Sequence, residues 1–139
     1  CTEIAKNGHE LVFGAGANGL MGAAARSFTR AGARITGVIP HFFKTDTVEP
    51  IYDKCDELIF TDTMRERKKI MEDTADAFVV LPGGIGTLEE LFEIITLKQL
   101  AQHKKPIAFY NIYGYYDKLM GFLDHCESEK FIREGCHNL

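Results

Sequence analysis

The sequence predicts an α/β fold in which a parallel β-sheet is covered by helices on both faces. Short apolar runs alternate with longer amphipathic segments along the 139 residues, and glycine-rich turns follow two of the runs, at 14–19 and at 83–86. Such alternation is typical of a parallel sheet, because each crossover helix returns the chain to the same edge. The length suits one domain with its own core, spanning residues 1–139.

The first half of the chain predicts three strands and three helical segments. Asn18 can cap the helix that follows it, and Gly32 can end that helix in a left-handed conformation. By range, we expect the end of a helix at 1–7, a strand at 10–13, a helix at 20–31, a strand at 34–39, a loop at 40–55, a strand at 57–60 and a helix at 63–75.

The second half predicts two further strand–helix pairs, separated by short polar turns. By range, we expect a strand at 77–81, a helix at 87–103, a strand at 106–110 and a helix at 115–126.

The stretch 81–90 predicts a phosphate-binding site. Gly83, Gly84 and Gly86 follow a short apolar strand and precede a helix that Thr87 would open. Glycine lets the backbone approach a ligand closely and tolerates positive φ, and a helix N-terminus directs N–H groups and partial positive charge at one spot. No Gly-Lys-Ser/Thr follows, so a monophosphate suits this turn better than the ligand of a P-loop.

The same residues also allow a purely structural interpretation. Thr87 and Glu90 have the spacing of a capping box, in which the hydroxyl and the carboxylate satisfy amides of the first helical turn. Spacing alone does not choose between the capping box and the anion site, although three glycines in four positions exceed the need of a simple turn.

Residues Gly14 to Gly19 match the G-x-G-x-x-G form of a dinucleotide-binding loop. That fingerprint also needs an acidic residue after the second strand, where it binds the ribose hydroxyls. The second strand leads instead into Pro40-His41-Phe42-Phe43. We therefore expect no NAD site, and we expect this loop to line the same cleft as the turn at 83–86.

The helix at 63–75 carries one charged residue on its apolar face. At helical spacing, Arg67 falls within the apolar stripe and Lys68 borders it. A guanidinium on a core-facing stripe is costly unless it meets a carboxylate or a phosphate, so Arg67 is either a structural ion-pair or snorkelling residue or part of a site. Met64, on the same stripe, is either core or a wall for a ligand.

The helix at 87–103 carries two apolar faces. Leu88, Leu91, Phe92 and Ile95 form a stripe suited to the sheet; Ile94, Leu97 and Ala101 lie nearly opposite, in line with Glu90. A helix that is apolar on both sides is enclosed within its domain or pressed against a partner. For a chain of this size we expect a homodimer through this helix, with Glu90 at the edge of the interface.

The composition excludes several classes of function. A net charge of −4 gives no electrostatic reason to expect nucleic-acid binding. No apolar run is long enough to span a membrane. Cys1, Cys55, Cys126 and Cys136 are scattered, and no histidines have metal-ligand spacing, so we expect free thiols in a reducing cytoplasm and no metal site.

Several motifs together resemble one known family. They are Met64-Arg-Glu-Arg-Lys68, Pro82-Gly-Gly-Ile-Gly-Thr-Leu-Glu-Glu90, Gly14-Ala-Gly-Ala-Asn-Gly-Leu-Met-Gly22, Gly37-Val-Ile-Pro40 and Asn111-Ile-Tyr-Gly-Tyr-Tyr116. On these residues the chain resembles the LONELY GUY (LOG) family of cytokinin-activating phosphoribohydrolases, long mislabelled as lysine decarboxylases. The resemblance covers essentially the whole chain.

The resemblance implies a Rossmann-like domain, usually a homodimer, that needs no cofactor. Its substrate would be a cytokinin riboside 5′-monophosphate or AMP, hydrolysed at the N-glycosidic bond to the free base and ribose 5-phosphate. Glu90 and Arg67 would be catalytic. Phosphate would bind at Gly83, Gly84, Gly86 and Thr87, and base and ribose at Met64, Lys68 and Gly16.

Two departures from the family pattern affect these expectations. The family's first strand, with its Gly-Ser-Ser loop, and its last strand and helix are missing, so we expect a trimmed portion of a longer chain rather than an incomplete site. Arg65 replaces a frequent histidine on the polar face, where we expect little effect.

Two other activities compete with hydrolysis. A non-enzymatic nucleotide or cofactor carrier of the same fold could use the same phosphate cradle, although a carrier has no need for both Arg67 and Glu90. Lysine decarboxylation is rejected, because Lys98 and Lys104 occupy polar helix or turn positions without a pyridoxal-phosphate setting.

Overall fold

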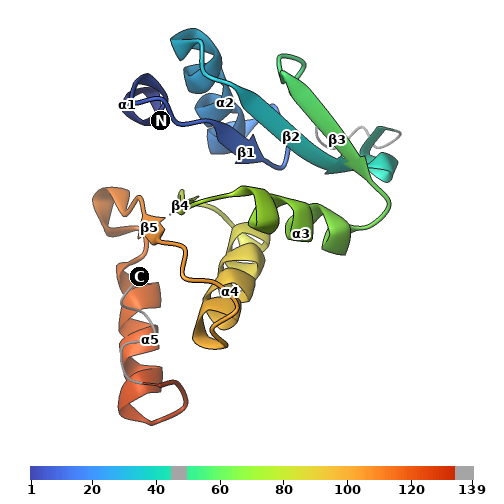
Figure 1. Cartoon of the computed structure of the whole chain (residues 1–139). Helices are drawn as coiled ribbons and strands as arrows, with labels where there is room; N and C mark the ends of the chain where they lie inside the picture. The colour runs from blue at the N-terminus through green and yellow to red at the C-terminus, as the bar shows by residue number, and fades with distance from the viewer. Residues whose placement is uncertain (45–49, 134–139) are drawn as a thin grey trace. The chain divides into compact units, whose positions relative to one another are not determined.

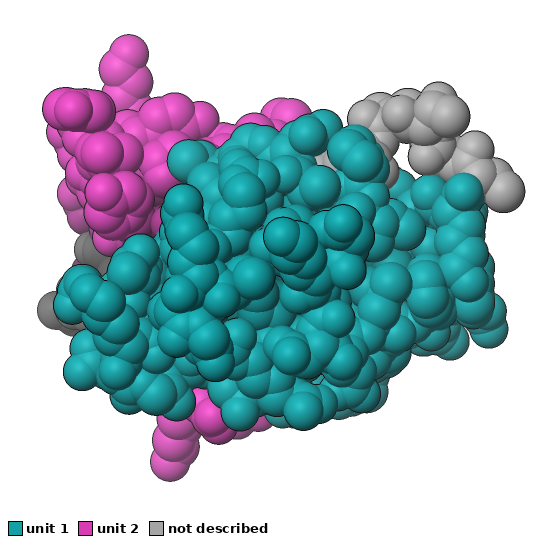
Figure 2. Space-filling view, turned by 90° about the horizontal axis from the view of Figure 1, so that it is seen from above, with its two compact units in different colours: residues 1–75 teal, residues 76–139 magenta. Residues whose placement is uncertain are grey.

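The computed structural model describes residues 1–44 and 50–133, and it has an α/β fold with parallel strands flanked by helices (Figure 1). This confirms the predicted fold class. Contacts divide the chain into two compact units, Cys1–Ala75 and Asp76–Leu139, which Figure 2 colours separately. Each unit has its own sheet and its own hydrophobic cluster. The thiol of Cys136 and the loop residues 45–49 lie outside the described residues.

The first unit contains a three-stranded parallel sheet in the order β1-β2-β3. Leu11 of β1 lies opposite Ile35 of β2, and Gly37 of β2 lies opposite Leu58 of β3. Its elements are α1 (Thr2–Lys6), β1 (Leu11–Phe13), α2 (Gly19–Ala31), β2 (Ile35–Pro40), the 3₁₀ turn η1 (His41–Lys44), β3 (Glu57–Thr61) and α3 (Met64–Thr74).

Helix α2 begins one residue before the expected start and ends at the expected residue. Gly32 takes a left-handed conformation with φ of 70°, and its N–H bonds to the last turn of the helix, as predicted. Asn18 occupies the N-cap position with extended backbone, but its side chain makes no capping hydrogen bond. The asparagine therefore marks the start of the helix without bonding to its amides.

Both faces of the first sheet are covered. Phe28 of α2 packs in one cluster with Phe13, Ile35 and Ile39 from the strands. Val38 is fully buried, and because successive side chains of a strand point to opposite faces, it lies on the face opposite to Ile39. Helix α3 contacts β2 on that second face. Helices α2 and α3 therefore enclose β1–β3, which fixes the start of α3 beside the carboxyl ends of the strands.

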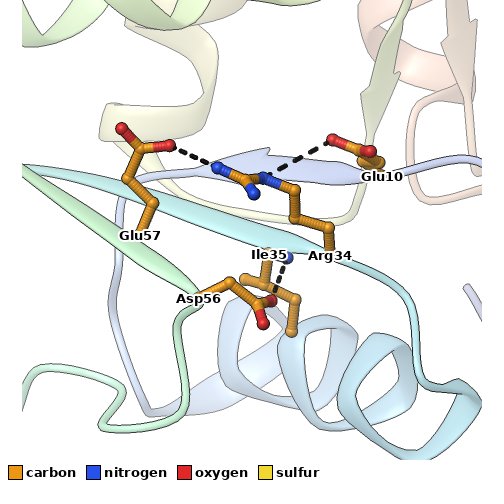
Figure 3. Close-up of polar contacts among 5 residues, drawn as sticks. All are labelled: Glu10, Arg34, Ile35, Asp56 and Glu57. Atoms are coloured by element: carbon orange, nitrogen blue, oxygen red, sulfur yellow. Dashed lines mark hydrogen bonds and ion pairs between the residues drawn. The ribbon is translucent and has the colours of Figure 1, made fainter.

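Polar contacts fix the amino-terminal ends of these strands (Figure 3). Arg34 Nη2 lies 2.7 Å from Glu57 Oε2, and Arg34 Nε lies 3.9 Å from Glu10 Oε2. The N–H of Ile35 donates to Asp56 Oδ2 across 2.7 Å, and the N–H of Asp56 donates back to the carbonyl of Ile35. This end of the sheet is thus structural, and the carboxyl end is left for a site.

The second unit contains a two-stranded parallel sheet in which Val79 of β4 lies opposite Ala108 of β5. One face of this sheet packs against both helices through Val80, Leu91, Ile107 and Tyr116. On the other face Val79 is 52% exposed. The elements of this unit are β4 (Phe78–Val80), α4 (Ile85–Gln99), β5 (Ile107–Phe109), the 3₁₀ turn η2 (Ile112–Gly114) and α5 (Asp117–Ser128).

Helix α4 buries a different stripe from the one predicted. Leu91 and Ile95 are in the core as expected, but Ile94 packs against the same cluster and Phe92 is 38% exposed. The buried stripe is therefore rotated toward Ile94, because both helix α5 and the sheet contribute to the cluster. Ala101 lies beyond the end of the helix, so it extends no second apolar face.

None of the helices within residues 1–44 and 50–133 combines the length and the apolar character needed to cross a membrane.

Candidate functional site

A glycine turn leads from β4 into α4 in the second unit. The helix begins at Ile85 with Gly84 as its N-cap, and its first intrahelical bond runs 3.1 Å from the N–H of Leu88 to the carbonyl of Gly84. The prediction that Thr87 opens the helix is therefore wrong by two residues. The amides of Ile85, Gly86 and Thr87 precede that first bond, so they point out of the helix end with the positive end of its dipole.

Thr87 does not form the alternative capping box with Glu90. It lies inside the helix, and no side chain caps the N-terminus of α4. The side chain of Thr87 packs instead against Gly83. A Cβ atom added to Gly83 would lie 2.8 Å from the Cβ atom of Thr87. The capping-box interpretation is thus wrong, and no side-chain cap bonds to the amides at the start of α4.

The glycines of this turn supply space, and none of them needs a left-handed backbone. The described residues with positive φ do not include Gly83, Gly84 or Gly86. A Cβ on Gly84 or Gly86 would meet no protein atom within 4 Å. The tolerance of glycine for positive φ is therefore not used in this turn, and its lack of a Cβ atom leaves the close approach of a ligand to bare backbone sterically open.

Two successive tyrosines hold the turn in place. The hydroxyl of Tyr115 donates to the carbonyl of Gly83 across 2.8 Å, and the hydroxyl of Tyr116 donates to the carbonyl of Leu81 across 2.6 Å. The side chain of Asn111 accepts from the N–H of Tyr116 at 2.7 Å and so fixes the start of α5. The sequence showed the segment Asn111–Tyr116 only as part of the family resemblance and predicted none of these contacts.

Glu90 lies on the same side of α4 as the first-turn amides. It follows Gly86 by four residues and Thr87 by three, which places all three on one face of the helix. Its side chain is half-buried. This places a carboxylate one turn beyond the glycine turn, on the side of the helix that carries Gly86 and Thr87.

The start of α3 fixes the direction of Arg67 in the first unit. Thr63 and Glu66 form a complete capping box, with the N–H of Glu66 donating to Thr63 Oγ1 at 3.1 Å. Thr61, at the end of β3, donates its hydroxyl to the carbonyl of Thr63 at 3.1 Å. The T-x-x-E spacing was readable at these positions, yet sequence reasoning applied it only to Thr87.

Arg67 is buried, as its place on the apolar stripe predicted. The residue has an exposed fraction of 9%, and its Nε donates to the carbonyl of Val38 at 3.2 Å. The guanidinium lies against Gly14, the first residue after β1. A permanent positive charge is thus held at the carboxyl end of β1 and beside the middle of β2, and the carboxyl ends of strands are where parallel sheets bind ligands.

The residues expected to bind base and ribose have different environments. Met64 is 39% exposed, so the alternative that it is a core residue is wrong. Lys68 is half-buried. Gly16 is buried and forms a bridge to Ile51, flanked by a 2.9 Å bond from the N–H of Ala17 to the carbonyl of Pro50. Arg65 is exposed, as expected.

The predicted site residues therefore fall into two groups. The first unit carries Gly16, Met64, Arg67 and Lys68, and the second unit carries Gly83, Gly84, Gly86, Thr87 and Glu90. The pairing of Arg67 with Glu90 stays a prediction. Among residues 1–44 and 50–133, no group of three His, Cys, Asp or Glu side chains is arranged to hold a metal ion.

Comparison with known proteins identifies relatives of this chain. Residues 21–139 match the family model described as "Possible lysine decarboxylase". The cytokinin riboside 5′-monophosphate phosphoribohydrolase LOG of Oryza sativa subsp. japonica is 42% identical over 139 residues, covering 99% of this chain and 56% of the relative. The enzyme LOG1 of Arabidopsis thaliana is 39% identical over 131 residues, covering 94% of this chain and 61% of the relative. The chain thus spans little more than half the length of these two relatives.

A solved structure shares the fold. The molybdenum cofactor binding protein of Rippkaea orientalis superposes with a TM-score of 0.65 at 24% sequence identity, covering 89% of this chain and 70% of that one. At this identity the likeness concerns the fold alone.

Proposed function

This chain belongs to the LOG family, and from that membership we propose that the whole protein hydrolyses the N-glycosidic bond of a purine nucleoside 5′-monophosphate. The products would be the free base and ribose 5-phosphate. The observation that carries the proposal is the glycine turn before α4, whose first-turn amides precede the first intrahelical bond and lie on the same side of the helix as Glu90.

The turn is proposed to bind the 5′-phosphate. Amides of Ile85, Gly86 and Thr87 supply donors, and the helix dipole adds partial positive charge. Open space above Gly84 and Gly86 supports the close approach of a phosphoryl group. Such a cradle accommodates one phosphate and lacks the lysine of a P-loop, which favours a monophosphate over a triphosphate.

Glu90 and Arg67 are proposed as the catalytic residues. Cleavage of the bond between sugar and base passes through a ribosyl cation with oxocarbenium character. A carboxylate can stabilise that cation, orient the ribose hydroxyls or activate the attacking water. Arg67 would keep the carboxylate ionised or bind the ribose or phosphate, and Met64, Lys68 and Gly16 would contact the base and ribose.

We also propose that the protein is a cytoplasmic homodimer that associates through α4. Ile85 and Phe92 are seven residues apart on this helix and are 84% and 38% exposed. Apolar side chains repeated along one helix face are typical of an interface. Sedimentation at several concentrations tests this, and a monomer at every concentration would contradict it.

The function is tested by incubating the full-length protein with AMP and with isopentenyladenosine monophosphate, and measuring free base and ribose 5-phosphate. We expect both products in equal amounts, and no release from the corresponding nucleosides, because these lack the phosphate that the turn binds. Binding of the nucleotides without any release would contradict hydrolysis and would indicate a carrier.

A further inference from the structure

Gly14 lies directly against the guanidinium of Arg67. A Cβ atom added to Gly14 would collide with Nη2 of Arg67 and would lie 2.8 Å from its Cζ and 3.3 Å from its Nε. The three nearest heavy atoms all belong to this one side chain. The volume that any other residue would fill at position 14 is therefore occupied by the arginine.

Backbone conformation does not account for the glycine. Positive φ occurs among the described glycines at Gly8, Gly19, Gly32 and Gly114, and not at Gly14. An alanine could adopt the backbone of Gly14, so the need for glycine is one of space.

The surrounding elements hold the helix turn and the Nε atom of Arg67 in place. Nε of Arg67 donates to the carbonyl of Val38, and the residue is 9% exposed. The capping box of Thr63 and Glu66 fixes the helix turn that carries the arginine. A side chain added at position 14 would therefore displace the guanidinium, the flexible end of Arg67, rather than the packed strands and helices.

We propose that Gly14 is a positioning residue, whose missing side chain determines where the charge of Arg67 lies at the carboxyl end of β1. The steric part of this proposal is independent of the reaction. Its catalytic consequence rests on the proposed function, in which the same guanidinium acts on the nucleotide.

The steric part is tested by a thermal-stability cycle on the full-length protein, with wild type, Gly14→Ala, Arg67→Ala and the double variant. We expect Gly14→Ala to lower Tm by a few degrees in wild type and to leave Tm unchanged or raised in the Arg67→Ala background, where the space is vacant. Gly121→Ala is the control, because a Cβ there meets nothing within 4 Å and should have equal effects in both backgrounds.

Equal Tm changes for Gly14→Ala in both backgrounds would overturn the proposal. If Gly14→Ala alone does not fold, recovery of folding in the double variant supports the proposal, and failure of both contradicts it.

The catalytic part is tested by base release from the nucleotide. We expect Gly14→Ala to lower kcat about 10²-fold, as a misplacement near 1 Å can, and Arg67→Lys to add little further loss in that background. Wild-type kcat in Gly14→Ala would overturn the positioning role. If the Tm effects of the two substitutions depend on each other but the wild-type protein releases no base, the proposed function is refuted and the steric relationship between Gly14 and Arg67 still holds.

Discussion

The hydroxyl of Tyr115 donates a 2.8 Å hydrogen bond to the carbonyl oxygen of Gly83, which lies 32 residues earlier in the chain. The hydroxyl of the next residue, Tyr116, donates to the carbonyl oxygen of Leu81 at 2.6 Å. The two tyrosines therefore bind two carbonyl groups of the same turn, two residues apart. The backbone that leads into α4 is thereby fixed before a ligand arrives. A preorganised turn loses less conformational entropy on binding, which would favour affinity for the phosphate that we propose binds here.

The first prediction concerns the Tyr115 hydroxyl. Tyr115 is 54% exposed, so Tyr115→Phe removes a surface hydrogen bond that contributes about 0.5–1.5 kcal/mol and should change Tm only slightly. We expect KM for the nucleotide to rise several-fold because the turn loosens. Tyr113→Phe is the matched control, since Tyr113 is fully exposed in the adjacent η2 turn. An unchanged KM for Tyr115→Phe would contradict the role of this bond.

The second prediction concerns stability. Tyr116 is 2% exposed, and Tyr116→Phe removes the donor to the carbonyl of Leu81 while keeping the ring in the core. Removing the donor to this part-buried carbonyl should lower the free energy of unfolding by about 0.5–1.5 kcal/mol. Urea denaturation measures this as a lower midpoint with an unchanged slope. A midpoint equal to that of wild type would show that the bond does not stabilise the fold.

The third prediction separates two glycines of the turn. Gly83→Ala places a methyl group against Thr87, so it should lower Tm and weaken nucleotide binding together. Gly84→Ala meets no protein atom within 4 Å, so Tm should change little while KM rises, because the methyl group enters the space proposed for phosphate. Calorimetry and steady-state kinetics on both variants distinguish these effects. A Gly84→Ala variant with wild-type KM would place the phosphate elsewhere.

The fourth prediction concerns pH. Burial is the largest cause that raises the pKa of the Cys55 thiol above its ordinary value of 9.0, and the negative charges of Asp56 and Asp53 raise it further. Alkylation by iodoacetamide, followed by mass spectrometry across pH, should give a higher midpoint in the folded protein than in the urea-unfolded chain. Asp53→Asn should lower the folded midpoint. A folded midpoint at or below the unfolded one would contradict the assigned environment.

The same shift has a defined effect on stability. The unfolded chain releases the Cys55 proton at a lower pH than the folded protein does, so the folded state binds more protons above the unfolded pKa. The contribution of this thiol to the free energy of unfolding therefore falls as pH rises through 9.0 and beyond.

Local signals in the sequence predicted much of the fold. Gly32 ends α2 as expected, because a left-handed C-cap is a property of one residue and its helix. Arg67 is buried as expected, because helical periodicity alone places it on the apolar stripe. The parallel pairing of the strands follows from their alternation with helices.

Features that depend on distant residues could not be predicted in this way. The bond from Tyr115 to Gly83 joins segments that no periodicity relates. The stripe that α4 buries includes Ile94 and leaves Phe92 exposed, because the cluster it packs into is built from residues of distant elements, the β4–β5 sheet and α5. The start of α4 was misplaced because Thr87 offers a better N-cap side chain than Gly84, whereas the turn held by the tyrosines begins the helix earlier.

Base release by Glu90→Gln tests the central claim most directly, with Glu89→Gln, a change at the exposed neighbouring residue, as the matched control. Removing the charge of a carboxylate that acts on the ribosyl cation should lower kcat by about 10²–10⁴-fold. Affinity for the nucleotide, measured by calorimetry, should stay near that of wild type, because the phosphate turn is unchanged. Glu89→Gln should keep wild-type kcat. A Glu90→Gln protein that releases base at the wild-type rate would contradict the assignment of this residue and of the site built around it.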